Sequence, residues 1–128
     1  MPVTLRWYEP DAILIMEVQG HVTSEDLDAW IETLSGYLEA ATRPIHLISD
    51  WQAASNYPIQ PSLIPRAAPV FRHDNMGWVA MVGVNPSLAF WAEVLTKLAG
   101  LRYRVFETVD AAAEHLQDID KARRQASS

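Results

Sequence analysis

Asp50 is the residue of this sequence for which the most chemical roles are possible. It follows the apolar run "HLIS" and is itself followed at once by Trp51. An acid in this place can be a catalytic group, a metal ligand, a phosphoryl acceptor or only a turn residue. A phosphoryl acceptor needs companion acids for Mg²⁺ and a nearby Thr and Lys, yet "SDWQAAS" supplies no second acid. We therefore favour Asp50 as a turn former that accepts hydrogen bonds from backbone amides.

Other polar residues follow the remaining predicted strands, and open α/β sheets bind ligands beyond the carboxyl ends of their strands. They are Gly20 and His21 after the second strand, Asn85 and Ser87 after the fourth, and Glu107 and Thr108 after the fifth. A two-carboxylate site of Asp50 with Glu107 would rest on this placement alone. Among the histidines, only His21 stands where a ligand can reach it, so it is a candidate ligand-binding residue.

The sequence lacks the motifs of several classes of site. No two of its four histidines lie three to five residues apart on one element, which is the spacing that zinc sites use. There is no cysteine, no G-x-S-x-G motif for a serine nucleophile and no glycine-rich phosphate loop. We predict no metal, no cofactor and no enzymatic activity.

Composition narrows the class of protein and its partners. A chain of 128 residues, with 49% hydrophobic and 20% charged residues, is typical of one soluble globular domain. The net charge of −6 argues against nucleic-acid binding, which needs a cationic face. No apolar run approaches the roughly 20 residues that span a bilayer, and no signal-like leader opens the chain. We therefore expect a cytoplasmic protein without a membrane span.

Hydrophobic periodicity predicts the order of the strands and helices. Alternating or continuous apolar runs indicate strands, and apolar residues at spacings of three and four indicate helices. The predicted strands are 3–8, 12–20, 45–49, 77–84 (with Gly83 inside it) and 103–107, and the predicted helices are 23–38, 85–100 and 108–119.

The helix boundaries carry recognisable capping signals. Thr23 and Asp26 have the spacing of a capping box, in which each side chain accepts a hydrogen bond from a free backbone amide. Asn85 followed by Pro86 is a typical helix start, and Gly100 is a typical stop. These signals support three regular helices between the strands.

The element order predicts a single α/β domain over residues 1–120. Strands that alternate with helices form a mainly parallel sheet with helices packed on it. The first of the five or so strands is joined to the second by a short turn and should be antiparallel to it. Residues 121–128 are expected to form a flexible C-terminal tail.

The segment 57–73 is apolar but rich in proline. Pro61, Pro65 and Pro69 remove amides at helical spacing, so we expect a helical turn and then a kinked second piece in place of one regular helix. Such a cover over the sheet leaves a groove for an apolar ligand or a partner's side chain. The residues expected around it are Trp51, Tyr57, Phe71 and Trp78, with Asp50, Arg66 or Arg72 as fixed polar groups. The alternative is that these aromatic residues only fill the core.

Four stretches together resemble the STAS superfamily of domains, and its SpoIIAA-like branch most closely. They are "GHVTSEDLDAW", "HLISD", "GWVAMVGVNPS" and "GLRYRVFETVDAAAEHL". The resemblance runs from about Ala12 to Leu116 and concerns markers of the fold, none of which is a catalytic motif. It implies a SpoIIAA-like α/β fold and a role like that of the bacterial anti-sigma-factor antagonists that typify the family.

The resemblance also implies where to seek a phosphosite. Antagonists of this family carry a phosphorylatable serine in a D-S-S-G-like turn at the start of the helix after the third strand. This sequence departs from that pattern, because "ISDWQAASNYP" continues into prolines. Ser55 and Ser62 lie in the corresponding region without the flanking acid and glycine. They are candidate phosphosites, or else Ser55 is a turn residue and Ser62 opens a helical turn.

Two functional hypotheses follow from the sequence. The first is a non-enzymatic STAS-like regulatory module that works through contact with a protein partner or with itself as a homodimer. The alternative is a carrier or sensor that binds a small apolar or amphipathic ligand under the Pro-rich segment 57–73.

Overall fold

The computed structural model describes residues 3–56 and 61–127, which form one five-stranded sheet in the order β1-β2-β3-β4-β5. The strands are β1 Val3–Glu9, β2 Ile13–His21, β3 Ile45–Asn56, β4 Met76–Val82 and β5 Tyr103–Phe106. β1 is antiparallel to β2, and every other neighbouring pair is parallel. This confirms the predicted α/β class and the antiparallel first strand.

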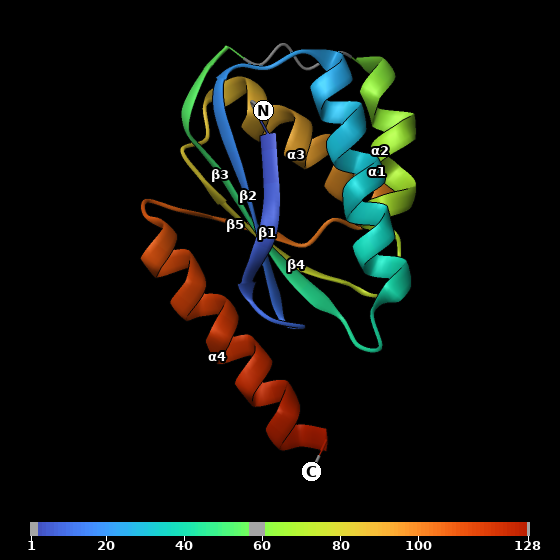
Figure 1. Cartoon of the computed structure of the whole chain (residues 1–128), viewed down its shortest axis with the longest axis vertical. Helices are drawn as coiled ribbons and strands as arrows, with labels where there is room; N and C mark the ends of the chain where they lie inside the picture. Colours follow the sequence, from blue (N-terminus) through green and yellow to red (C-terminus); the bar gives the residue numbers. More distant parts are fainter. Residues whose placement is uncertain (1–2, 57–60, 128) are drawn as a thin grey trace.

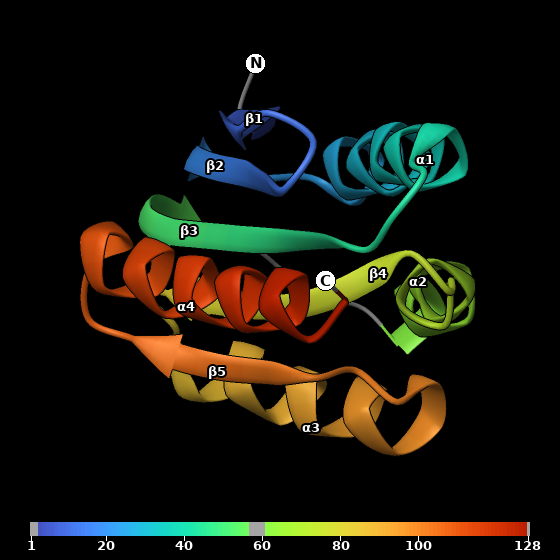
Figure 2. The same cartoon turned by 90° about the horizontal axis from the view of Figure 1, so that it is seen from below.

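The helices cover the two faces of the sheet unequally. They are α1 Ser24–Ala40, the short 3₁₀ helix η1 Pro61–Leu63, α2 Ile64–Phe71, α3 Pro86–Ala99 and α4 Val109–Ser127. The helices α1, α2 and α3 lie on one face, while α4 lies alone across the other (Figure 1; Figure 2). The domain therefore has three layers, with the sheet between α1–α3 on one side and α4 on the other.

Alternation along the strands divides the core into two clusters. On β4, Val79 and Met81 join the cluster under α1–α3, whereas Ala80 and Val82 join the smaller cluster under α4. Leu116 of α4 packs in that smaller cluster and is fully buried. Because both faces of the central strands are covered, these strands read as nearly continuous apolar runs.

The capping signals hold in the structure. Thr23 Oγ1 accepts a hydrogen bond from Asp26 N at 3.1 Å, and the Asp26 carboxylate accepts one from Thr23 N at 2.9 Å. These two bonds hold the pKa of Asp26 below its usual value. Asn85 Oδ1 accepts from Leu88 N at 2.8 Å, and Gly100 ends α3 in the left-handed conformation with φ of 69°. The predicted capping box, N-cap and C-cap are confirmed.

The ends of β4 and of α4 differ from the sequence prediction. Gly83 lies just after β4, where its φ of 75° requires glycine and a Cβ would come within 2.7 Å of Gln52 N. At the other boundary, 121–127 continue α4 as a helix. These residues are mainly good helix formers, and Arg124 makes an ion pair of 3.1 Å with Asp120 one turn earlier.

His46 organises the junction between β3 and β4. Its side chain is fully buried, and its Nδ1 accepts a hydrogen bond from Trp78 N at 2.9 Å. The register between the two strands shifts at this point, from Ile45 opposite Met76 to Leu47 opposite Val79. A side chain of β3 thus takes the place of a backbone acceptor for one amide of β4.

Gly77 makes room for this imidazole. A Cβ on Gly77 would lie 2.4 Å from His46 Nδ1 and 2.9 Å from the carbonyl oxygen of Ile45. We therefore expect Gly77→Ala to lower the free energy of unfolding by on the order of 1–3 kcal/mol, the usual cost of overpacking. Gly36→Ala is the matched control, because a Cβ there meets nothing within 4 Å inside α1. That change should stabilise the protein by roughly 0.5–1 kcal/mol in the same urea titration. Equal stability of the two variants would contradict this account.

The second nitrogen of His46 faces α4. His46 Nε2 is buried and has no hydrogen-bond partner within the described ranges. Burial lowers the pKa of His46 to about 4, with Arg123 and Arg102 acting in the same direction and Asp120 opposing them. His46 is therefore neutral at pH 7, and protonation would place a charge beneath α4.

This burial makes stability depend on pH in a defined window. The folded pKa of about 4 lies below the ordinary value of 6.5, so the unfolded chain binds the proton more readily. The contribution of neutral, buried His46 to the free energy of unfolding is complete above pH 6.5 and is lost as the pH falls to about 4. The whole change in that free energy is on the order of 3 kcal/mol. His46→Asn keeps an acceptor for Trp78 N but does not titrate. The difference between wild-type and variant free energies of unfolding should therefore change with pH across this window, and a constant difference would overturn the assignment.

Candidate functional site

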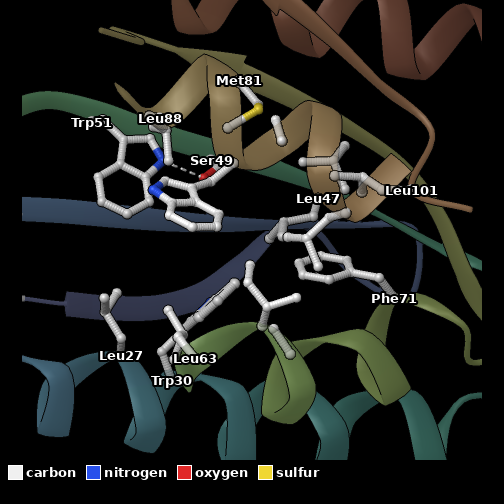
Figure 3. A pocket seen from close by; sticks show the side chains of 16 residues that line it. Leu27, Trp30, Leu47, Ser49, Trp51, Leu63, Phe71, Met81, Leu88 and Leu101 are labelled. Carbon is white, nitrogen blue, oxygen red and sulfur yellow. Dashed lines mark hydrogen bonds between the residues drawn. The ribbon is translucent and has the colours of Figure 1, made fainter. Parts of the chain in front are cut away.

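A small cavity lies between the sheet and the three helices α1, α2 and α3. Its volume is about 70 Å³, and its wall comes from β3, β4, the three helices and the connection before β5 (Figure 3). The residues around it include Leu27, Trp30, Trp51, Phe71, Leu88 and Trp91. This cavity lies where the sequence predicts a groove under the Pro-rich segment.

The strand β3 supplies the part of the wall that carries a polar group. Leu47, Ser49 and Trp51 alternate along the strand and all line the cavity. Trp51 Nε1 donates a hydrogen bond of 2.6 Å to Ser49 Oγ, shown as the dashed line in Figure 3. Among the described residues, every other lining side chain is apolar or aromatic, so the cavity suits an apolar occupant.

Residues 61–71 of the Pro-rich segment cover the cavity in two helical pieces, as predicted. The 3₁₀ turn η1 precedes α2, which has a proline at its start and Pro69 in its interior. Leu63, Ile64 and Ala67 are buried and line the cavity from this side. Leu63 provides no side-chain cap for α2, so apolar packing is the evident support of this short helix.

The structure brings together two of the predicted groove residues and separates the others. Trp51 and Phe71 line the cavity. Trp78 instead packs in the cluster under α4, on the opposite face of the sheet, so its predicted place beside Trp51 is wrong. Tyr57 lies outside the described residues. His21 is the last residue of β2 and is exposed.

Asp50 does not end its strand, contrary to the prediction. It lies in the middle of β3, because this strand continues to pair with β2 as far as Asn56. The pairing shifts between Asp50 and Ala53, and Asp50 Oδ1 accepts a hydrogen bond from Gln52 N at 3.0 Å within this irregular stretch. The carboxylate therefore does bond a backbone amide, but at a bulge rather than in a turn.

The two expected arginines also have other partners. Arg66 makes an ion pair of 3.0 Å with Asp28 of α1. Arg72 donates a hydrogen bond of 2.6 Å to the carbonyl oxygen of Leu98, at the end of α3. Neither lines the cavity, whose polar group is Ser49. The signal for Ser49 is present in "HLISDW", because Leu47, Ser49 and Trp51 share one face of a strand.

The candidate phosphosites have accessible positions. Ser55 is exposed near the end of β3, and Ser62 is exposed in η1, immediately before α2. Ser62 thus lies at the start of the helical segment after the third strand. Phosphorylation at either residue stays a prediction.

Neither a metal site nor a membrane span is found in the part of the chain that the structure describes. These residues contain no group of three histidine or acidic side chains arranged to hold a metal ion. None of the helices they form combines the length and hydropathy that crossing a lipid bilayer demands.

The architecture defines a class of protein: an α/β domain with three helices on one face of a mainly parallel sheet and a single C-terminal helix on the other. The SpoIIAA-like family model matches residues 13–117, and the chain belongs to this family. The resemblance seen in the sequence is thereby confirmed.

Two solved structures share this fold at low sequence identity. One is an uncharacterized protein of the DUF3478 family with a SpoIIAA-like fold from Shewanella loihica PV-4, with a TM-score of 0.62 and 16% identity over 89% of this chain and 91% of that one. The other is an anti-sigma-factor antagonist (STAS) domain protein from Planctomyces limnophilus, with a TM-score of 0.59 and 13% identity over 89% and 96% of the two chains. A search of curated proteins gives no match.

The assignment of Asp50 as a backbone anchor can be tested by substitution. Asp50→Ala removes the acceptor for Gln52 N, and we expect the free energy of unfolding to fall by roughly 1–2 kcal/mol. Asp50→Asn retains a neutral acceptor and should cost less. Urea denaturation monitored by circular dichroism measures both. If both variants were as stable as the wild type, the anchoring role would have to be abandoned.

Proposed function

We propose that this chain is a non-enzymatic regulatory module that acts by binding a protein partner. The observation that carries the proposal is the exposure of three large apolar side chains, Phe90 and Leu98 on α3 and Val105 on β5. Their exposed fractions are 60%, 53% and 50%. Where such side chains lie together on a surface, they mark interaction sites on soluble domains.

The dispersal of the polar candidates supports binding over catalysis. Asp50 is bonded to the backbone of β3, His21 lies at the end of β2, and the cavity has an apolar wall with Ser49 as its polar group. A general acid or base must lie within hydrogen-bond reach of the proton that it transfers, and neither Asp50 nor His21 lines the cavity. Membership of the SpoIIAA-like family, and the fold shared with an anti-sigma-factor antagonist domain protein, agree with regulation by protein contact.

The partner can be another protein or a second copy of this chain. We expect a tagged form, cross-linked in its native cells, to retain a specific partner, and Phe90→Ser to reduce the amount retained at least fivefold. Gln117→Ser, at an exposed position on α4, is the control and should retain it fully. Equal retention by both variants would remove the support for this surface.

Self-association is measured separately by light scattering after size exclusion. A homodimer should have twice the monomer mass at high micromolar concentration. A strict monomer at that concentration would exclude the homodimer. The proposed partner would then be a different protein.

The cavity favours a second candidate function, in which the protein carries or senses a small apolar molecule. Trp30 lines this cavity, and its Nε1 is buried without a hydrogen-bond partner within the described ranges. Buried donors of this kind are uncommon in native proteins, and an occupant with an acceptor group would satisfy it. A volume of about 70 Å³ admits only a small molecule unless the helices move apart, since drug-sized ligands occupy roughly 300 Å³ or more.

Native mass spectrometry distinguishes this second function from the first. A carrier should show an adduct mass after gentle purification, and Ala92→Val should reduce the adduct because Ala92 is buried in the cavity wall. Ala111→Val, exposed on α4, is the matched control. A clean protein mass, with no thermal shift across a panel of small apolar compounds, would count against the carrier.

A further inference from the structure

The open edge of β5 presents backbone groups that can pair with another strand. β5 is the last strand of the sheet and pairs with β4 on one side (Figure 2). Val79 N donates a hydrogen bond of 2.8 Å to the carbonyl oxygen of Arg102. Since bonding directions alternate along a strand, Tyr103 and Val105 direct their N–H and C=O groups toward the open edge.

The two sides of this edge differ in chemistry. Val105 lies opposite Met81 in the register, on the face that carries α3, where Phe90 is held by an edge-to-face contact with Trp91 at 5.1 Å. Arg104 lies opposite Ala80, on the α4 face, with its guanidinium 5.9 Å from the centre of the Phe106 ring. An added strand would therefore meet apolar side chains on one face and a cation on the other.

Basic residues border this edge although the chain as a whole carries a net charge of −6. Lys97 and Arg104 are exposed; Arg102 is exposed too, but its guanidinium donates a hydrogen bond of 2.9 Å to the carbonyl oxygen of Met76 on β4. Of the nearby acids, Glu93 accepts a hydrogen bond from the Tyr103 hydroxyl, and Glu107 follows the strand. The edge therefore favours an acidic segment.

We propose that β5 is the docking edge for an extended segment of a partner protein in which acidic and apolar residues alternate. The inference rests on the proposed function and names the surface and the chemistry of the partner. Apolar residues of the segment would face Val105, and its acids would face Arg104. A second copy of β5 would instead bring arginines of the two copies together, and like charges at a strand edge oppose such pairing.

A random 12-residue peptide display library tests the proposal directly. Selection on the wild-type protein should enrich peptides in which acidic and apolar residues alternate. A synthetic enriched peptide should bind Arg104→Glu at least tenfold more weakly, and Lys121→Glu, an equal charge change on exposed α4, as tightly as wild type. In nuclear magnetic resonance spectra, the peptide should shift the amide signals of Tyr103 and Val105.

Several results would overturn the inference. They are an enriched set without excess acids, equal binding to Arg104→Glu, or amide shifts confined to other strands. Arg104→Gln provides a second variant with a smaller charge change, should Arg104→Glu fold poorly. If Arg104→Glu still retains the cross-linked cellular partner, the proposed function stands and this edge is not its docking site. If no partner is retained while the peptides still select β5, the proposed function fails and the chemistry of the edge stands.

Discussion

The alternation of side chains along β3 is the constraint on which the rest of the structure depends. Leu47, Ser49 and Trp51 face the layer of α1–α3, whereas His46 and Ile48 face α4. Because both faces are buried, a shift of one residue would place the imidazole in the apolar cavity and the indole against α4. One strand therefore fixes the contents of both cores, and the His46 bond to Trp78 N holds its register against β4.

Most of the fold could be predicted because its signals are local. The capping box at Thr23, the Asn85 cap and the glycine at 100 each depend on only a few neighbouring residues in the sequence. The alternation of strands with helices then limits the possible topologies. The lengths of β3 and α4 could not be predicted in this way. β3 continues past Asp50 because β2 offers a long pairing partner, and a pairing partner is invisible in the strand's own sequence.

The candidate site was only partly accessible to sequence reasoning for a similar reason. The sequence shows which residues are aromatic, but the face of the sheet that each one occupies depends on strand register. The register places Trp51 in the cavity and Trp78 under α4. A lone serine in a strand matches no motif, and only its alternation with Leu47 and Trp51 places Ser49 on the cavity face. Asp50 can be identified from the sequence as a charged residue after an apolar run. Its hydrogen bond with Gln52 N, however, lies at a bulge that arises from the pairing of β3 with β2.

The unequal covering of the two sheet faces has a consequence for the order of synthesis. The helices α1, α2 and α3 each emerge from the ribosome between the strands that they connect, so their face of the sheet can close as the strands are made. The helix α4 follows all five strands, and until it emerges Ile13, Ile15 and Ile48 have no cover. Nascent chains with the strands complete but α4 still absent would therefore present the aggregation-prone surface of this protein, the kind of exposed apolar surface that chaperones bind.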